Sequence, residues 1–335
     1  MKILFIGGTG TISMAITKQI LKEGKDELYL LNRGNRNNSL EGIKEINVDI
    51  NGDINKVKEK LKDLEFDCVC DFIIFHLDQA KRDYELFKDK TKQFIFISSA
   101  SAYKKPVDNF IITEKTPLEN PYWQYSRDKK EIEEYFLDKY KTEGFPITIV
   151  RPSHTYDERS VPLGVHGAKG SYQVVKRMLE GKKVIIHGDG ESLWVMTNNY
   201  DFAKLFVPLI GNSKTIGEAY QITGDEVLTW NNIYKNIANA LNVELKPIYV
   251  SSQLLAELSD FEGTLIGDKA NSVIFDNKKV KEFNPNFKQE ILFKDGIKKT
   301  IDYVLTHKEC QIEDKEFDDF CDKLIEKLEK IKEEF

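Results

Sequence analysis

The first twenty residues constrain the fold most, because they place a glycine-rich turn between an apolar run and a segment with helical spacing. Residues Ile3 to Ile6 are continuously apolar, which is typical of a strand buried on both faces. The turn GGTGTIS follows, and apolar residues then recur at Ile16, Ile20 and Leu21. A strand, a glycine turn and a helix in this order can hold a phosphate through backbone N–H groups at the helix N-terminus.

The turn predicts a dinucleotide site, and a βα turn that binds nothing is the alternative. Gly7 would permit the tight turn, Gly10 would let the backbone approach a pyrophosphate, and Ser13 stands where a third glycine would lie. We therefore expect cofactor contacts from these residues of the turn: Gly7, Thr9, Gly10, Thr11 and Ile12.

Strand-like and helix-like segments alternate through the first half of the chain. Strands are expected at 27–31, 43–48, 66–75 and 93–97, and helices at 56–64, 79–87 and 125–140. This alternation predicts an α/β protein with a Rossmann fold, a doubly wound parallel sheet. The chemistry is then expected at the carboxyl ends of the strands.

The ends of two expected strands indicate which dinucleotide would bind. Asn32 and Arg33 follow the second strand, where an acidic residue would accept a hydrogen bond from a free ribose 2′-OH and an arginine suits a 2′-phosphate. This favours NADP over NAD, with Arg36 as a further basic contact, although a solvated loop would also explain both arginines. Asp49 and Ile50 are expected at the adenine edge.

Reactive side chains follow two of the expected elements. Ser98 and Ser99 end the 93–97 strand, and Tyr125 and Lys129 lie four residues apart on one helical face. A nearby ammonium lowers the pKa of a phenol, so Tyr125 could exchange a proton with a substrate hydroxyl while Ser99 donates to the carbonyl oxygen. A Tyr-x-x-x-Lys pair by itself arises by chance on many charged helices, so only the combination is informative.

Together with the N-terminal turn and the segment ITIVRP at 147–152, these residues resemble the extended short-chain dehydrogenase/reductase superfamily. More narrowly, they resemble its NAD-dependent epimerase/dehydratase family, including atypical members, from Met1 to about Val304. The resemblance implies that Ser99, Tyr125 and Lys129 are catalytic. It implies further cofactor contacts by Phe72, Ile73, Ser98, Tyr125, Lys129, Pro152, Ser153 and His154, and substrate contacts by Ser99, His154, Thr155 and Trp194.

Three positions bear on the reaction and the substrate. Ala100 and Ser101 stand where sugar-nucleotide 4,6-dehydratases of the family carry an Asp-Glu pair, which disfavours dehydratase chemistry. Trp194 stands where relatives acting on nucleotide sugars often have an arginine that grips the diphosphate, so a sugar-like substrate without a nucleotide is favoured, while a nucleotide sugar stays open. His154 could assist proton transfer, bind a substrate hydroxyl, or be only a hydrogen-bonded wall residue.

The resemblance also implies the organisation of the chain. An NADP-binding Rossmann domain is expected at 1–159 plus about 192–225, a smaller C-terminal substrate-binding α/β domain at about 160–191 plus 226–305, and a helical tail at 306–335. A homodimer through two long helices, one of them at 125–140, is expected on the same grounds. The apolar stripe of the tail predicts packing on its own domain, with a partner helix as the alternative.

Composition restricts the other classes of function. A net charge of −6 gives no basic field for nucleic acid, and no apolar segment is long enough to span a membrane. The four cysteines and five histidines lack metal-ligand spacing, so no metal is predicted and a cytoplasmic protein with reduced thiols is expected. The expected activity is NAD(P)-dependent epimerisation or oxidoreduction of a small molecule. The alternative is an NADP-binding regulatory or RNA-associated member without turnover.

Overall fold

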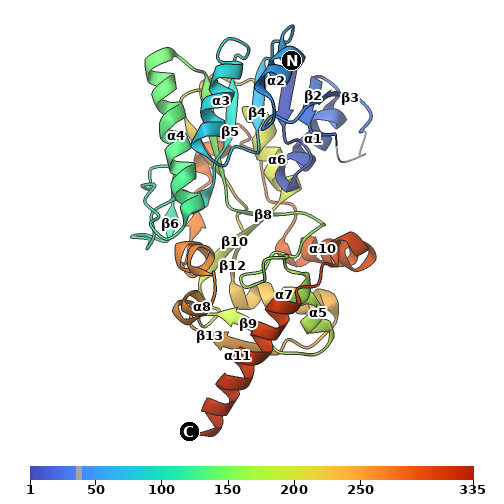
Figure 1. The fold of residues 1–335 in the computed structure, drawn as a ribbon, viewed down its shortest axis with the longest axis vertical. Helices are drawn as coiled ribbons and strands as arrows, with labels where there is room; N and C mark the ends of the chain where they lie inside the picture. The colour runs from blue at the N-terminus through green and yellow to red at the C-terminus, as the bar shows by residue number, and fades with distance from the viewer. Residues whose placement is uncertain (35–39) are drawn as a thin grey trace.

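The computed structural model describes residues 1–34 and 40–335 and is built around a seven-stranded parallel sheet (Figure 1). The strands lie in the order β11-β7-β5-β4-β1-β2-β3, so the sheet grows outward in both directions from the boundary between β1 and β4. This order confirms the doubly wound α/β fold. The strands are β1 (Lys2–Ile6), β2 (Glu27–Asn32), β3 (Ile43–Asn47), β4 (Cys68–Asp71), β5 (Phe94–Ile97), β7 (Ile147–Pro152) and β11 (Ala219–Ile222).

Helices cover both faces of this sheet, and the alternation of side chains along β1 shows how. Ile3 and Phe5 belong to the core beneath α1 (Thr11–Glu23) and α6 (Asn199–Phe206). Leu4 and Ile6 point the other way, into the core beneath α2 (Ile54–Leu61), α3 (Leu77–Phe87) and α4 (Gln124–Glu143). Because both faces are buried, the strand sequences are continuously apolar rather than alternating.

The expected strand at 66–75 is much shorter in the structure, where β4 ends at Asp71. The Asp71 carboxylate accepts a hydrogen bond from the Ile73 backbone N–H at 2.7 Å, which turns the chain out of the sheet. This turn carries Ile73 toward Gly7, so the apolar run ends in a loop beside the glycine turn.

A second core lies beyond the carboxyl ends of the strands, below the sheet in Figure 1. It is built on two small sheets, β8 (His154–Tyr156) with β10 (Leu193–Asn198) and β12 (Val227–Thr229), and β9 (Val184–His187) with β13 (Pro247–Val250). Its helical elements are α5 (Tyr172–Leu179), α7 (Trp230–Leu241), α8 (Ser252–Leu258), a π-helix (Glu262–Lys269) and α10 (Phe293–Thr306). A minor strand pair, β6 (Ile111–Ile112) with β14 (Ile274–Phe275), and the short α9 (Lys278–Lys281) complete the part beyond the sheet.

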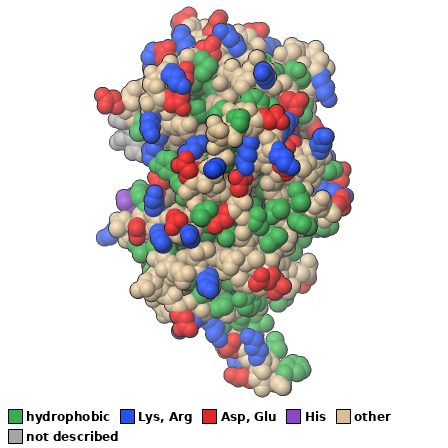
Figure 2. Space-filling view, turned by 180° about the vertical axis from the view of Figure 1, so that it is seen from behind, with side chains coloured by type: hydrophobic (Ala, Val, Ile, Leu, Met, Phe, Trp, Pro, Cys, Tyr) green, Lys and Arg blue, Asp and Glu red, His purple; other side chains and the backbone are tan. Residues whose placement is uncertain are grey.

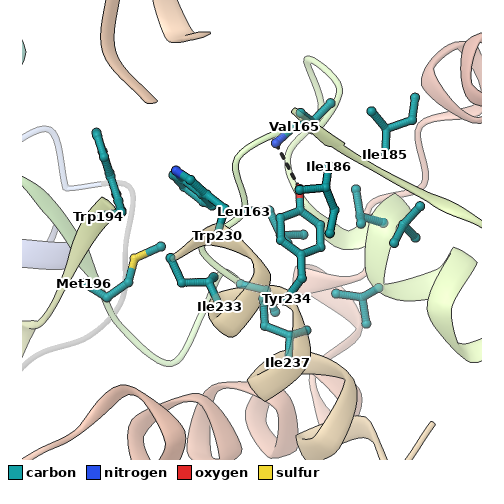
Figure 3. Close-up of a cluster of buried hydrophobic side chains, with 14 of the residues drawn as sticks. Leu163, Val165, Ile185, Ile186, Trp194, Met196, Trp230, Ile233, Tyr234 and Ile237 are labelled. Carbon is teal, nitrogen blue, oxygen red and sulfur yellow. Dashed lines mark hydrogen bonds between the residues drawn. The ribbon is translucent and has the colours of Figure 1, made fainter. Parts of the chain in front are cut away.

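Trp230 and Tyr234 of α7 occupy the centre of this second core, together with Trp194 of β10 (Figure 3). The Tyr234 hydroxyl accepts a hydrogen bond from the Val165 N–H at 3.2 Å, so its polar atom is satisfied although the ring is buried. The predicted division of the chain into domains stays a prediction.

The C-terminal helix α11 (Lys315–Glu333) packs its first half onto this second core and then extends away from it (Figure 1). Phe317, Cys321 and Leu324 are buried, whereas Ile331 is half exposed. The buried Arg177 of α5 pairs with Asp318 at 2.5 Å, which ties α11 to the body of the molecule.

The surface is charged but mixed in sign. On the face shown in Figure 2, Lys and Arg side chains are interspersed with Asp and Glu. Within the described ranges, no helix combines the length and apolar character needed to cross a membrane.

Candidate functional site

The glycine turn between β1 and α1 is held in place by the packing of Ile73 and by hydrogen bonds to the Ser13 hydroxyl. Gly7 has φ 80°, and a Cβ there would lie 2.6 Å from Ile73 Cγ2, so only glycine fits. Ser13, where a third glycine was considered, accepts from the Gly10 N–H at 2.8 Å and donates to the Gly7 carbonyl at 2.9 Å. The first-turn N–H groups of α1 have no acceptor within the helix and are available to an anion.

A cavity of about 400 Å³ lies over this turn. The structure brings eight of the predicted cofactor residues to its wall: Gly7, Thr9, Gly10, Asn32, Arg33, Asp49, Ile50 and Ile73. Glu45 also lines it, so the wall at the ends of β2 and β3 carries both charge signs. Arg36 lies outside the described residues.

The cavity and turn have the shape and chemistry that a dinucleotide needs. Gly7 and Gly10 line the cavity without a Cβ, which allows a ligand to approach the backbone closely. The N-terminus of α1 faces the same side and favours negative charge. The residues present therefore fit a nicotinamide dinucleotide.

Tyr125 and Lys129 lie one turn apart near the start of α4, next to the carboxyl end of β5. Lys129 is 2 % exposed, and its ammonium donates to the carbonyls of Ile74 at 2.6 Å and Ile97 at 2.9 Å. It lies 5.6 Å from the centre of the Tyr125 ring. Burial lowers the pKa of Lys129 to about 7, with the negative charges of Asp71 and Glu133 acting in the opposite direction.

Ser99 lies beside this pair at the end of β5. Its side-chain oxygen accepts from the Ser101 N–H at 3.1 Å and lies 2.9 Å from the Ser101 hydroxyl. Burial raises the pKa of Tyr125, and a hydrogen bond with Ser99 works against that rise. The buried Ser98 hydroxyl has no hydrogen-bond partner in the part of the chain that the structure describes.

Phe72 and the residues after β7 are distributed around this centre. Phe72 packs on Phe5 and Phe206, with ring centres 5.3 Å and 6.1 Å away, so it supports the sheet face under α6. Pro152 ends β7 and Ser153 connects it to β8. The Thr155 hydroxyl donates to the Ser153 carbonyl at 3.4 Å. The catalytic, cofactor and substrate roles of all these residues stay predictions.

His154 and Trp194 meet although they are forty positions apart. Their strands β8 and β10 pair in parallel, and the Trp194 indole N–H donates to His154 Nδ1 at 3.2 Å. Trp194 is only 2 % exposed, so it lies behind His154 rather than on the open wall. Burial, assisted by the positive charge of Lys269, lowers the pKa of His154 to about 3.

Several residues that were not among the predicted site residues also lie near the site in the structure. The Asn199 amide at the start of α6 donates to the Thr11 carbonyl at 3.1 Å, and Arg159 reaches Thr9 and Thr11 at 3.4 Å. Lys269 is fixed by its backbone carbonyl, which accepts hydrogen bonds from His187, Ser192 and Trp230. The sequence carries no local signal for Lys269, because its place depends on contacts between distant elements.

Within residues 1–34 and 40–335, no three His, Cys, Asp or Glu side chains gather in a way that could hold a metal ion.

The doubly wound sheet is the fold that the resemblance to extended short-chain dehydrogenases/reductases implies. The chain belongs to the NAD dependent epimerase/dehydratase family, whose sequence model matches residues 3–223. Among curated proteins, it is similar to a putative UDP-glucose 4-epimerase of Methanocaldococcus jannaschii, with 24% identity over 90% of this chain and 98% of the relative.

Two other relatives differ in what their names describe. The chloroplast stem-loop binding protein of 41 kDa b of Arabidopsis thaliana is 25% identical over 71% of this chain and 63% of its own. The structure of UDP-glucuronic acid 4-epimerase from Bacillus cereus, in complex with UDP-glucuronic acid and NAD, has a TM-score of 0.72 and 20% identity. That match covers 91% of this chain and 99% of the other, and at this identity it shows the fold alone.

Proposed function

We propose that the protein catalyses NAD(P)-dependent epimerisation or oxidoreduction at a hydroxyl or carbonyl carbon of a sugar-like small molecule. The observation that carries this proposal is the buried Lys129 ammonium, placed 5.6 Å from the Tyr125 ring centre beside Ser99. Burying an ammonium costs free energy, so its presence needs a reason. A role in proton transfer with the neighbouring phenol and hydroxyl at the strand ends supplies that reason.

Each member of the set has a distinct task. The Tyr125 phenol takes the proton from the substrate hydroxyl during oxidation and returns it during reduction. The Lys129 ammonium stabilises the phenolate, and Ser99 donates a hydrogen bond to the substrate oxygen. A nicotinamide, when bound, supplies hydride transfer at the same carbon.

The cofactor part of the proposal concerns which dinucleotide binds. Gly7, Gly10 and the N-terminus of α1 would hold the pyrophosphate, and Asp49 and Ile50 would border the adenine. Asn32 and Arg33 at the end of β2 support NADP(H) over NAD(H). Among the similar structures, the two epimerases from Bacillus cereus and Thermus thermophilus are complexes with NAD, so direct titration of both nucleotides is the deciding measurement.

The substrate part of the proposal is limited to a class. The names of several relatives refer to UDP-sugars, which supports a sugar or nucleotide sugar. A nucleotide sugar is disfavoured by Trp194, which is buried and uncharged and stands where an arginine would bind the diphosphate. A second candidate, an RNA-associated protein without turnover, is supported by the stem-loop binding relative alone.

The proposal is tested by Tyr125→Phe. Because the phenol carries the proton, we expect kcat to fall at least about 100-fold, with dinucleotide affinity and thermal stability retained. Activity would be assayed against a panel of sugars and UDP-sugars, and binding by titration of NADPH and NADH.

Tyr140→Phe on the same helix is the control, because Tyr140 is 38% exposed and stands four turns further along α4. Mass spectrometry of the nucleotide released on denaturation distinguishes an epimerase from a reductase, because it shows whether the protein retains its cofactor and in which redox state. Tightly bound oxidised cofactor supports an epimerase, and exchangeable cofactor supports a reductase. Full activity of Tyr125→Phe would refute the catalytic assignment.

A further inference from the structure

The contact between Trp194 and His154 decides which proton the imidazole carries. An indole nitrogen is only a donor, so His154 Nδ1 must accept the hydrogen bond at 3.2 Å and cannot itself bear a proton. A neutral imidazole has one N–H, which is then on Nε2. The hydrogen bond from Trp194 therefore selects one tautomer.

The surroundings of His154 disfavour the charged form as well. The His154 ring lies between Trp194 and Trp230, and the centre of each indole is 6.3 Å from the centre of the imidazole. The positive charge of the Lys269 side chain further lowers the pKa of His154. A second proton on Nδ1 would also break the Trp194 bond. A positive charge on His166 would also lower the pKa of His154. The ring is therefore neutral around pH 7.

The opposite nitrogen, Nε2, is open to a ligand. No hydrogen bond to it is found among the described residues, and the His154 residue is only partly buried, so Nε2 keeps some exposure. His154 lies two residues beyond the carboxyl end of β7, and Ser99 lies two residues beyond the carboxyl end of the neighbouring strand β5. His154 therefore lies at the same edge of the sheet as the proposed catalytic set.

We propose that His154 is a fixed, neutral hydrogen-bond donor to a substrate oxygen, and that Trp194 is the residue that holds it in that form. This inference rests on the proposed function for its substrate. It resolves the earlier alternatives, because a ring whose only free nitrogen already carries a proton cannot act as a general base. Trp194 acts through His154 and is a positioning residue.

The tautomer is tested without any assay of activity. In ¹⁵N-labelled protein, two-bond ¹H–¹⁵N spectra distinguish the protonated from the unprotonated nitrogen of each of the five histidines. The His154 signals are identified by their loss in His154→Gln. We expect Nε2–H with an unprotonated Nδ1, unchanged between pH 8 and pH 5. An Nδ1–H tautomer, or an imidazolium at pH 7, would overturn the proposal.

Two variants extend the test. Trp194→Phe keeps the bulk and removes the donor, so we expect the Nδ1–H tautomer or protonation above pH 5 to appear. In the catalytic assay, His154→Gln keeps an N–H donor at a comparable reach and should stay within a few-fold of wild type in kcat/KM. His154→Phe should lose about 10-fold or more.

The failure of this proposal can be told from failure of the proposed function. If Tyr125→Phe is fully active while the His154 tautomer is as expected, the proposed reaction is wrong and the ring assignment stands. If Tyr125→Phe is inactive but His154→Phe matches wild type, His154 does not contact the substrate and this proposal fails.

Discussion

One buried histidine of the second core, His187, is held neutral by the residues around it. His187 is 1% exposed, and its Nε2–H donates to the Lys269 carbonyl at 3.1 Å. Its Nδ1 is buried with no hydrogen-bond partner in the described part of the chain. Burial lowers the pKa of His187 from 6.5 to about 4, because a second proton would place a charge among apolar rings.

This arrangement predicts a loss of stability in acid. The folded-state pKa is depressed, so the unfolded chain binds more protons between pH 6.5 and about 4, and the free energy of unfolding falls as the pH falls. His187→Gln keeps a donor for Lys269 but cannot be protonated. We expect it to reduce the slope by up to about 1.4 kcal/mol per pH unit.

Denaturant unfolding at several pH values between 4.5 and 7.5 measures this slope. His76→Gln is the matched control, because the His76 side chain is 66% exposed. Equal slopes for wild type and His187→Gln would contradict the assignment of a neutral buried ring.

At the scale of an element, the β1–turn–α1 unit combines a strained backbone with close packing. Gly7 in the turn and Gly24 at the C-terminal end of α1 both have positive φ, 80° and 65°. They differ in their surroundings, since a Cβ at Gly7 would strike Ile73 whereas nothing lies within 4 Å of one at Gly24. Alanine variants at these two positions therefore separate the effect of backbone strain from the effect of filling the proposed dinucleotide site.

We expect Gly7→Ala to abolish measurable nucleotide binding, because Ile73 must move into the cavity that it lines. Gly24→Ala should cost about 1 kcal/mol of stability through strain alone and leave binding unchanged. Calorimetric titration with NADPH and NADH, together with thermal unfolding, measures both effects. Equal nucleotide affinity in the two variants would mean that this glycine turn is not the binding site.

The glycine turn between β1 and α1 and the fold were predictable from the sequence because they depend on local patterns. Strand, turn and helix are contiguous, and Tyr125 and Lys129 are one helical turn apart. The end of β4 at Asp71 was not predictable, since one carboxylate turns an apolar run out of the sheet. Nor was the contact of His154 with Trp194, because it requires the pairing of β8 with β10 across forty residues.

At the scale of the whole molecule, one buried arginine joins the last helix to the rest. Arg177 is 2% exposed and its guanidinium contacts Asp318 at 2.5 Å, Asp322 at 2.8 Å and the Lys183 carbonyl at 3.0 Å. Phe317 and Cys321 complete the contact by packing into the second core. The start of α11 is thus part of the folded body.

Arg177→Met would leave Asp318 with only the more exposed Lys182, whose ammonium lies 3.0 Å from the carboxylate. We expect a loss of about 2 kcal/mol in the free energy of unfolding, because the Asp318 side chain is only 18% exposed but keeps this second cation. Lys176→Met on the same helix is the control, since its pair with Glu313 is largely exposed and should be worth less than about 1 kcal/mol. Urea denaturation measures both, and equal losses would show that α11 is held by its apolar contacts alone.

The order of strands also governs how the chain acquires its structure during synthesis. Ile3 of β1 pairs with Leu28 on one side but with Cys68 on the other, so one edge of this apolar strand stays open until β4 has emerged. Contacts of such long sequence separation slow folding and lengthen the exposure of unpaired edges. We therefore expect the open edge of β1 to be exposed to aggregation until β4 covers it, although β1 lies inside the finished sheet between β4 and β2.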